Sequence, residues 1–209
     1  MKEFTLTGHQ LTINFIRHHN IFSDVNLSVS NKQIVGIAGA NGSGKTTLLK
    51  VLACVLNPSS GNIQLDIEGN PVKKDDIPSH IGFVSPYLTL YEEFTPVEHL
   101  RLFAKFRDME LNESWAADIL KEFNLFKRRR DLIKTFSSGM KQRVKYMLAL
   151  QLKPELLFLD EPFTNLDGAG IDSVIGIIKS HTDNGGGVII ASNDDREKEL
   201  CSSIIELHN

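Results

Sequence analysis

The sequence predicts an α/β fold with a mostly parallel β-sheet covered by helices on both sides, preceded by an antiparallel β-subdomain and interrupted by an inserted α-helical subdomain. Ile34 to Ala38 and Leu156 to Leu159 are almost uninterrupted apolar runs, which are typical of strands buried on both faces of a parallel sheet. Between these runs, residues 86–152 show mainly helical periodicity. We therefore expect the whole chain to form one domain, with a core at about 1–85 and 153–209.

Alternating apolar and polar residues predict half-buried strands in the N-terminal third. From residue 4 to residue 29 the pattern is short and alternating, with Val25, Leu27 and Val29 on one face, which favours antiparallel strands. A second alternating segment runs from Ile63 to Ile67 and ends at turn residues.

Helices are predicted where apolar residues recur at helical spacing between a start signal and a stop signal. Thr95 to Glu98 is a capping box with proline at the first helical position, and Ser137 precedes a helix that Pro154 closes. The remaining predicted elements are helices at 48–56, 115–123 and 171–178 and short apolar strands at 81–84 and 188–191, followed by a short charged helix and the apolar segment Ile204 to Leu207.

The composition disfavours several classes of function. A formal net charge of −3 gives no electrostatic reason to expect nucleic acid as a partner, and we interpret the basic run Lys127 to Arg130 as a solvated helix end or loop. Cys54 and Cys201 have no CxxC spacing, so we expect buried reduced thiols in a reducing cytosol. No apolar stretch approaches the ~18 residues needed to cross a bilayer, and residues 1–10 lack the pattern of a signal peptide.

A glycine-rich segment predicts a phosphate-binding loop. Gly39 to Thr46 satisfies the pattern GxxxxGK[ST] and lies between a predicted buried strand and a helix start. The glycines let backbone N–H groups face a phosphate at the positive end of a helix, while Lys45 adds charge and the Thr46 hydroxyl can bind Mg²⁺. A flexible glycine turn is the alternative, but it does not explain the strand, the lysine, the threonine and the helix together. We therefore expect a P-loop NTPase core that binds a nucleoside triphosphate with magnesium.

Two carboxylates follow the second buried strand. Asp160 and Glu161 come directly after Leu156 to Leu159, where ligand sites of open α/β sheets are found. Asp160 would hold the magnesium ion and Glu161 would polarise the attacking water. Alternatively, both acids only cap the turn at Pro162.

Further motifs decide which class of triphosphatase the chain is similar to. Phe136 to Arg143 resembles the signature of the ABC ATPases, usually written LSGGQ, and Asn165 to Asp167 resembles the D-loop of that family. Ser137 and the amides near Gly139 lie at a predicted helix N-terminus with nothing obvious in this chain to bind, which implies a second phosphate-binding surface. The chain thus resembles ABC transporter ATP-binding subunits over its whole length.

The resemblance implies ATP and Mg²⁺ as cofactors and a base-stacking aromatic residue before the phosphate loop. Phe15 is the candidate, although Ile16 could take that register and an ordinary core phenylalanine is an equal alternative. The residues expected to bind nucleotide are Phe15, Gly39, Ala40, Asn41, Gly42, Ser43, Gly44, Lys45, Thr46, Thr47, Ser137, Ser138, Gly139 and Asp167; those expected to act in catalysis are Lys45, Glu161 and Asn193, and those expected to bind the metal are Thr46 and Asp160.

The resemblance also implies partners. ATP would lie between two protomers, which are either two copies of this chain or this chain and a different one. The motor would bind a separately encoded integral membrane permease near Tyr87 to His99 and would lie peripherally on the cytoplasmic face of the membrane. A soluble ABC ATPase in cofactor assembly is the alternative; a nucleoside or shikimate-type kinase is disfavoured by the order of the motifs.

The sequence departs from the family pattern at two positions near the expected site. Pro86 stands where the family usually has a glutamine that touches magnesium and water, and Asn193 stands where it usually has a histidine. Proline offers no side-chain polar group, and asparagine cannot acquire positive charge. Ser138 and Met140 also replace the usual glycine and glutamine of the signature. We therefore expect hydrolysis that is slower than in members with both residues, unless a different partner chain supplies the missing groups.

Overall fold

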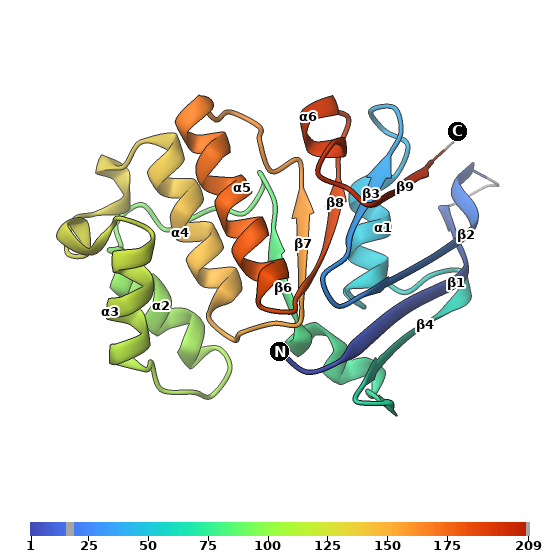
Figure 1. Cartoon of the computed structure of the whole chain (residues 1–209), viewed down its shortest axis with the longest axis horizontal. Helices are drawn as coiled ribbons and strands as arrows, with labels where there is room; N and C mark the ends of the chain where they lie inside the picture. The colour runs from blue at the N-terminus through green and yellow to red at the C-terminus, as the bar shows by residue number, and fades with distance from the viewer. Residues whose placement is uncertain (16–18, 208–209) are drawn as a thin grey trace.

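The structure is a computed structural model that describes residues 1–15 and 19–207, without the side chains of Phe15 and His19. Its strands form two sheets, and most of its helices flank the second sheet (Figure 1). Among the described residues, no helix combines the length and the apolar character that a membrane crossing requires.

The first sheet is antiparallel and is built from the N-terminal third of the chain. Its strand order is β2-β1-β4-β5, and Leu6 of β1 lies opposite Val29 of β2 and Leu65 of β4. The apolar faces of β1, β2 and β4 all turn towards the same core, as the alternating pattern predicted. The strands are β1 (Phe4–Phe15), β2 (His19–Ser30), β4 (Ser60–Ile67) and β5 (Asn70–Pro71).

The second sheet is parallel and confirms the predicted fold class. Its strand order is β6-β7-β8-β3-β9. Leu156 and Phe158 of β7 face the core below the antiparallel sheet, whereas Leu157 and Leu159 face a second core on the other side. Because both faces are buried, the first four positions of this strand, Leu156 to Leu159, are all apolar. The strands are β3 (Ile34–Ala38), β6 (Ile81–Val84), β7 (Leu156–Asp160), β8 (Gly187–Ala191) and β9 (Ser203–Glu206).

Helices fill the two cores on opposite sides of the parallel sheet. Helix α1 (Lys45–Leu52) shares its core with the antiparallel sheet, while α4 (Ser138–Leu150) and α5 (Gly168–Asp183) share the other. The sequence predicted that the first helix continues to Leu56, but it ends four residues earlier at Leu52. Cys54 has a φ of 54°, and the N–H groups of Val55 and Leu56 both donate to the carbonyl oxygen of Lys50, which closes the helix.

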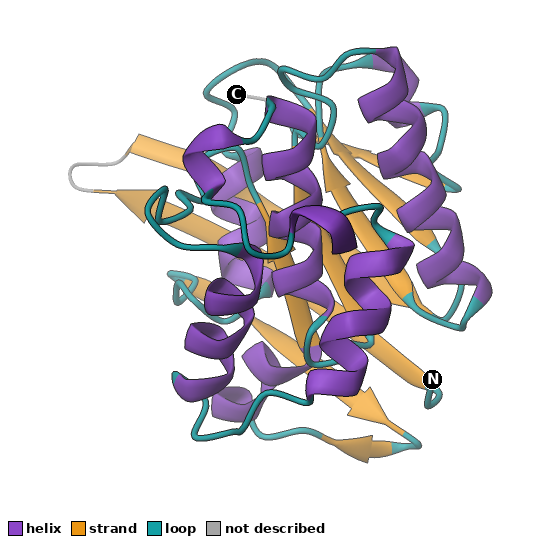
Figure 2. Ribbon diagram, turned by 90° about the vertical axis from the view of Figure 1, so that its left-hand side faces the viewer, coloured by secondary structure: helices purple, strands orange, loops and turns teal. Residues whose placement is uncertain are grey.

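The segment between β6 and β7 is helical, as expected. Thr95 and Glu98 form the predicted capping box: the Glu98 carboxylate accepts from the Thr95 N–H at 2.7 Å, and the Thr95 hydroxyl accepts from the Glu98 N–H at 3.2 Å. In Figure 2, which faces this side of the molecule, these helices lie in front of the strands. The helices before α4 are α2 (Pro96–Lys105), α3 (Glu113–Glu122), η2 (Phe126–Arg128) and η3 (Ile133–Thr135); η1 (Lys74–His80) precedes β6.

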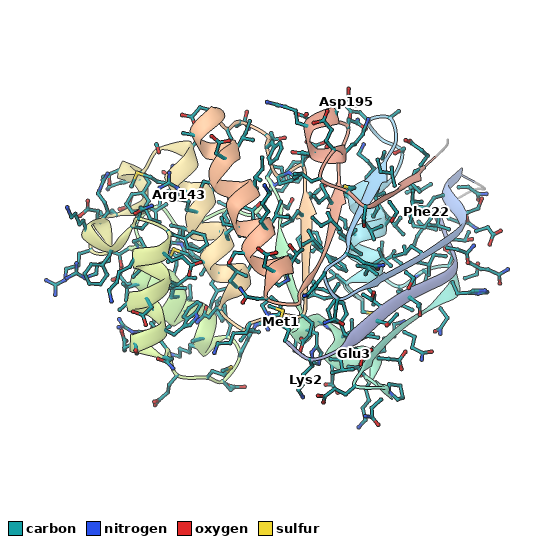
Figure 3. The ribbon with its side chains drawn as sticks, in the orientation of Figure 1. Met1, Lys2, Glu3, Phe22, Arg143 and Asp195 are labelled. Carbon is teal, nitrogen blue, oxygen red and sulfur yellow. The ribbon has the colours of Figure 1, made fainter. Side chains whose placement is uncertain are left out.

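The carboxyl ends of the parallel strands lie at the edge of the molecule opposite the N-terminus. Asp195, which starts α6 (Asp195–Lys198) after β8, marks that edge in Figure 3, whereas Met1, Lys2 and Glu3 lie at the other. Loops that follow β3, β6, β7 and β8 are therefore gathered in one place.

One buried acid forms a hydrogen bond between the segment after β8 and the segment after β7. Glu197 is 1% exposed, and its carboxyl oxygen Oε1 accepts a hydrogen bond of 2.6 Å from the N–H of Phe163. Burial raises the pKa of Glu197 from 4.5 to about 7, although hydrogen bonds from Ser192 and Phe163 act in the opposite direction. The carboxyl group therefore holds its proton in the folded chain to a higher pH than in the unfolded chain.

We expect Glu197→Gln to flatten the dependence of stability on pH. As the pH rises from about 5.5 to 8, the unfolded chain releases this proton first, so the wild type should lose about 2 kcal/mol of unfolding free energy that the glutamine variant keeps. Guanidinium unfolding at both pH values measures the difference.

Glu199→Gln, on an exposed side chain of the same segment, is the matched control and should follow the wild type. Parallel stability profiles for Glu197→Gln and the wild type would show that the buried carboxyl does not titrate in this way.

Candidate nucleotide-binding site

The predicted phosphate loop leaves the carboxyl end of β3 and runs into α1. Three of its glycines have positive φ angles: 146° at Gly39, 86° at Gly42 and 95° at Gly44. A Cβ atom at Gly44 would lie 2.3 Å from Cγ2 of Ile21, and one at Gly39 would lie 2.6 Å from the carbonyl oxygen of Leu207. Both the backbone conformation and the space therefore require glycine at these two positions.

The loop and the first turn of α1 place the predicted binding residues together. Because Gly44 precedes the helix and has no side chain, it leaves the N–H groups of the first turn available to an anion. Ser43 is buried, and its N–H donates to the carbonyl oxygen of Ala40 at 3.1 Å. The residues brought together here are Gly39, Ala40, Asn41, Gly42, Ser43, Gly44, Lys45, Thr46 and Thr47.

Lys45 is folded back over the loop. Its side chain is buried, and its ammonium group donates to the carbonyl oxygens of Gly39 at 2.7 Å and Ala40 at 3.1 Å. A phosphate bound in the loop would offer the same ammonium group stronger, charge-assisted hydrogen bonds.

The side chains of Thr46, Ser85 and Asp160, which come from three different segments, are joined by hydrogen bonds. The Thr46 hydroxyl donates to both carboxylate oxygens of Asp160, at 3.0 and 2.9 Å, and the Ser85 hydroxyl donates to Oδ2 at 3.3 Å. Asp160 is 3% exposed; burial raises its pKa, whereas the hydrogen bonds from Thr46 and Ser85 lower it. Hydroxyl and carboxylate oxygens are the donors that Mg²⁺ prefers, so this group of residues fits the ion.

Ser85 was not predicted from the sequence. It directly follows β6, which pairs with β7, so it lies at the same edge of the sheet as Asp160. The available signal was a polar residue at the carboxyl end of a short apolar strand, which became informative only once the strand order was known.

Glu161 directly follows β7 and has a strained backbone conformation. Its φ is 45°, its N–H donates to the carbonyl oxygen of Ala191 at 2.9 Å, and its carboxylate accepts from the Thr164 hydroxyl at 3.3 Å. A non-glycine residue with positive φ is uncommon and is often found at functional sites.

Asn193, after β8, contacts the phosphate loop directly. Its side-chain amide donates to Oδ1 of Asn41 at 2.7 Å, and both residues are exposed. The residue at the position where the family usually has a histidine therefore lies beside the loop as a neutral amide.

The signature residues lie on a different surface. Ser137 is exposed and caps α4, accepting a hydrogen bond from the Met140 N–H at 3.3 Å; Ser138 is exposed and Gly139 is partly so. Figure 1 shows α4 and the phosphate loop on opposite sides of β7.

Two further predicted binding positions lie elsewhere. Asp167 caps α5 by accepting a hydrogen bond from the Gly170 N–H at 2.8 Å. The side chain of Phe15 and the alternative residue, Ile16, lie outside the described residues.

Comparisons with known proteins identify the family to which the chain belongs. The family model described as ABC transporter matches residues 22–164, which is more than half of the chain. The chain is 32% identical over 192 residues to the ABC-type transporter ATP-binding protein EcsA of Bacillus subtilis, covering 90% of this chain and 78% of that protein. It is also 32% identical over 173 residues to the cytochrome c biogenesis ATP-binding export protein CcmA of Dechloromonas aromatica, covering 83% and 85%.

A solved structure described as the ATP-binding subunit of an ABC transporter superposes with a TM-score of 0.82 at 29% identity, covering 97% of this chain and 85% of that one. The family model, the relatives and the shared fold lead to one assignment. The chain belongs to the ABC transporter family and is an ATP-binding ATPase of that family.

Proposed function

We propose that this chain hydrolyses ATP to drive transport through a separate membrane permease, which it binds from the cytoplasmic face. The observation that carries the proposal is the meeting of Lys45, Thr46 and Asp160 at one edge of the parallel sheet. A sheet that carries a phosphate loop and a buried carboxylate at the same edge can bind a triphosphate and its cation together.

Each residue of the site has a role in the proposed reaction. The loop amides and the N-terminus of α1 hold the phosphates, and Lys45 neutralises their outer charge. Thr46 and Asp160 hold Mg²⁺, which supplies neutralising charge to the phosphate oxygens when bound. Glu161 orients and polarises the attacking water from the end of β7. Asn193 hydrogen-bonds the terminal phosphate without adding charge.

The exposed N-terminus of α4 supports the proposal that the nucleotide is bound between two protomers. Ser137 and Gly139 present a hydroxyl and backbone N–H groups at the surface, where a phosphate of a nucleotide bound to a neighbouring molecule can be held. A nucleotide that is bound by both protomers stabilises the closed dimer, and its hydrolysis releases that stabilisation.

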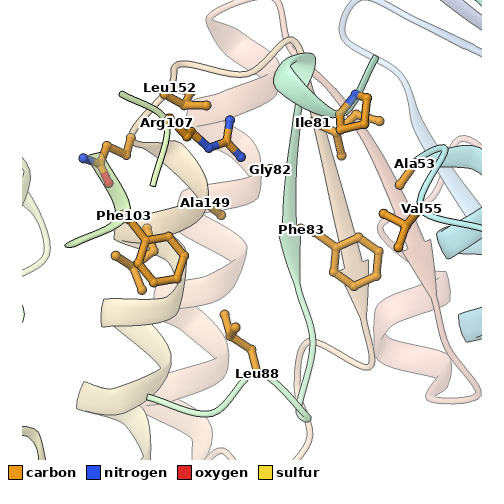
Figure 4. A pocket seen from close by; sticks show the side chains of 13 residues that line it. Ala53, Val55, Ile81, Gly82, Phe83, Leu88, Phe103, Arg107, Ala149 and Leu152 are labelled. Atoms are coloured by element: carbon orange, nitrogen blue, oxygen red, sulfur yellow. The ribbon is translucent and has the colours of Figure 1, made fainter. Parts of the chain in front are cut away.

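A groove between the sheet and the helical segment is the proposed permease site. It has a volume of about 260 Å³, and Figure 4 shows Val55 and Phe83 on one side facing Phe103 and Ala149 on the other. Val55 is 71% exposed, and Tyr87 and Tyr91, near the groove in sequence, are exposed at 82% and 55%. Exposed apolar side chains around a hollow are typical of a protein–protein interface.

Glu161→Gln should abolish turnover while preserving ATP binding. The amide has the shape of the carboxylate but cannot polarise the attacking water, so kcat should fall by about 100-fold or more. Phosphate release measures turnover, and gel filtration with ATP measures dimer formation by the trapped nucleotide. Gel filtration beside candidate partner chains distinguishes a homodimer from a heterodimer; undiminished turnover would show that Glu161 does not have this role.

Asn193→His should raise the steady-state rate. Histidine can carry positive charge near the developing charge on the phosphate, so we expect kcat to increase by about fivefold. An unchanged rate would mean that this position does not limit hydrolysis.

Val55→Asp should weaken permease binding and leave basal hydrolysis unchanged. A carboxylate in the groove would be desolvated against apolar side chains of the partner. Co-purification from solubilised membranes measures the effect, and Met109→Asp, on another exposed apolar residue, is the control. Recovery of a soluble scaffold protein in place of a polytopic membrane protein would favour the cofactor-assembly function.

A further inference from the structure

The segment after β6 is held by a lysine from α4. The ammonium group of Lys145 donates to the carbonyl oxygens of Ser85 at 3.3 Å and Pro86 at 3.1 Å. Lys145 lies about two helical turns after Ser137, on the helix whose N-terminus forms the proposed second phosphate-binding surface. Since Pro86 has neither a polar side chain nor an N–H, its carbonyl oxygen is its one polar group available for such a contact.

The same segment contacts the proposed magnesium site. Ser85 is buried, and while its carbonyl oxygen accepts from Lys145, its hydroxyl donates to Asp160. Asp160 in turn accepts from Thr46. A continuous series of hydrogen bonds therefore runs from α4 through Ser85 to the carboxylate and the first turn of α1.

Packing alone does not explain a lysine at this position. Lys145 is half-buried, and burial lowers its pKa, so the charged group is destabilised there relative to water. In the described part of the chain its ammonium group contacts carbonyl oxygens and forms no ion pair within 4.0 Å. An apolar side chain would avoid this desolvation, so the favourable contribution of the lysine comes from its two hydrogen bonds.

A hollow at the surface lies beside Lys145 and the segment after β6. It has a volume of about 230 Å³ and is lined by Pro86 and Leu88 from this segment, by Gln142 and Lys145 from α4, and by Asn165 from the loop before α5. Because few atoms pack against Pro86 on that side, the hydrogen bonds from Lys145 matter more for its position.

We propose that Lys145 is a positioning residue that holds the segment after β6 against α4 and thereby keeps the Ser85 hydroxyl on Asp160. The position of α4 is then linked to the geometry of the proposed magnesium site. Pro86 has no polar side-chain group that could contact this site directly. The inference rests on the proposed binding of ATP with Mg²⁺ at this site.

Equilibrium binding of a fluorescent ATP analogue, with Mg²⁺ and with EDTA, tests this role without turnover. Lys145→Met keeps the unbranched stem but removes both hydrogen bonds, so affinity in Mg²⁺ should fall by about fivefold while affinity in EDTA stays the same. Lys145→Arg can still donate to the carbonyl oxygens and should keep most of the affinity. Lys134→Met, an exposed lysine paired with Glu93, is the matched control and should behave as the wild type.

The double variant with Ser85→Ala tests whether the two residues act through one path. If they do, adding Ser85→Ala to Lys145→Met should cause little further loss of affinity in Mg²⁺. Additive losses, or equal losses with Mg²⁺ and with EDTA, would overturn the proposal. Should Lys145→Met not fold, Lys145→Gln, whose side chain is polar but shorter and uncharged, replaces it with the same expected direction of change.

Nucleotide binding by the wild type, measured with Mg²⁺ and with EDTA, distinguishes failure of the proposed function from failure of the proposed role of Lys145. Absence of nucleotide binding to the wild type under both conditions would overturn the proposed function itself. Binding that is strengthened by Mg²⁺ in the wild type and equally in Lys145→Met would overturn the role of Lys145 alone.

Discussion

The hydrogen bonds from Thr46 to Asp160 are the interaction on which the arrangement of this molecule depends. They join residues that are 114 positions apart in the sequence, one on the first turn of α1 and the other at the end of β7. They form because β8 pairs with both β7 and β3, so that the phosphate loop and the carboxylate leave the sheet at the same edge. A buried carboxylate without such partners would strongly destabilise the fold.

The departures from the family pattern lie on the two sides of this carboxylate. Pro86 follows β6 and Asn193 follows β8, the two neighbours of β7 in the sheet. Neither position carries a charge, so in the proposed site Lys45 and a bound cation would provide the positive charge that balances the phosphates. Such a site would depend more on its metal than one with a charged side chain after β8.

Patterns that are local in the sequence predicted most of the fold. The apolar runs of β3 and β7, the glycines of the phosphate loop and the capping box at Thr95 each satisfy a rule that involves a few neighbouring residues. Ser85, Lys145 and Glu197 were missed because each is a single polar residue whose partner lies on another segment. The end of α1 was wrong because apolar spacing does not reveal that Cys54 adopts a left-handed conformation. The domain boundaries and the roles of individual site residues remain predictions.

The contact between β2 and the phosphate loop has a further consequence. Ile21 lies so close to Gly44 that there is no room for a side chain at position 44, and it limits movement of the loop towards the antiparallel sheet. In the proposed site the backbone N–H groups of the loop would therefore be held in place before a phosphate binds. Less conformational entropy would be lost on binding, so more of the contact energy would appear as affinity.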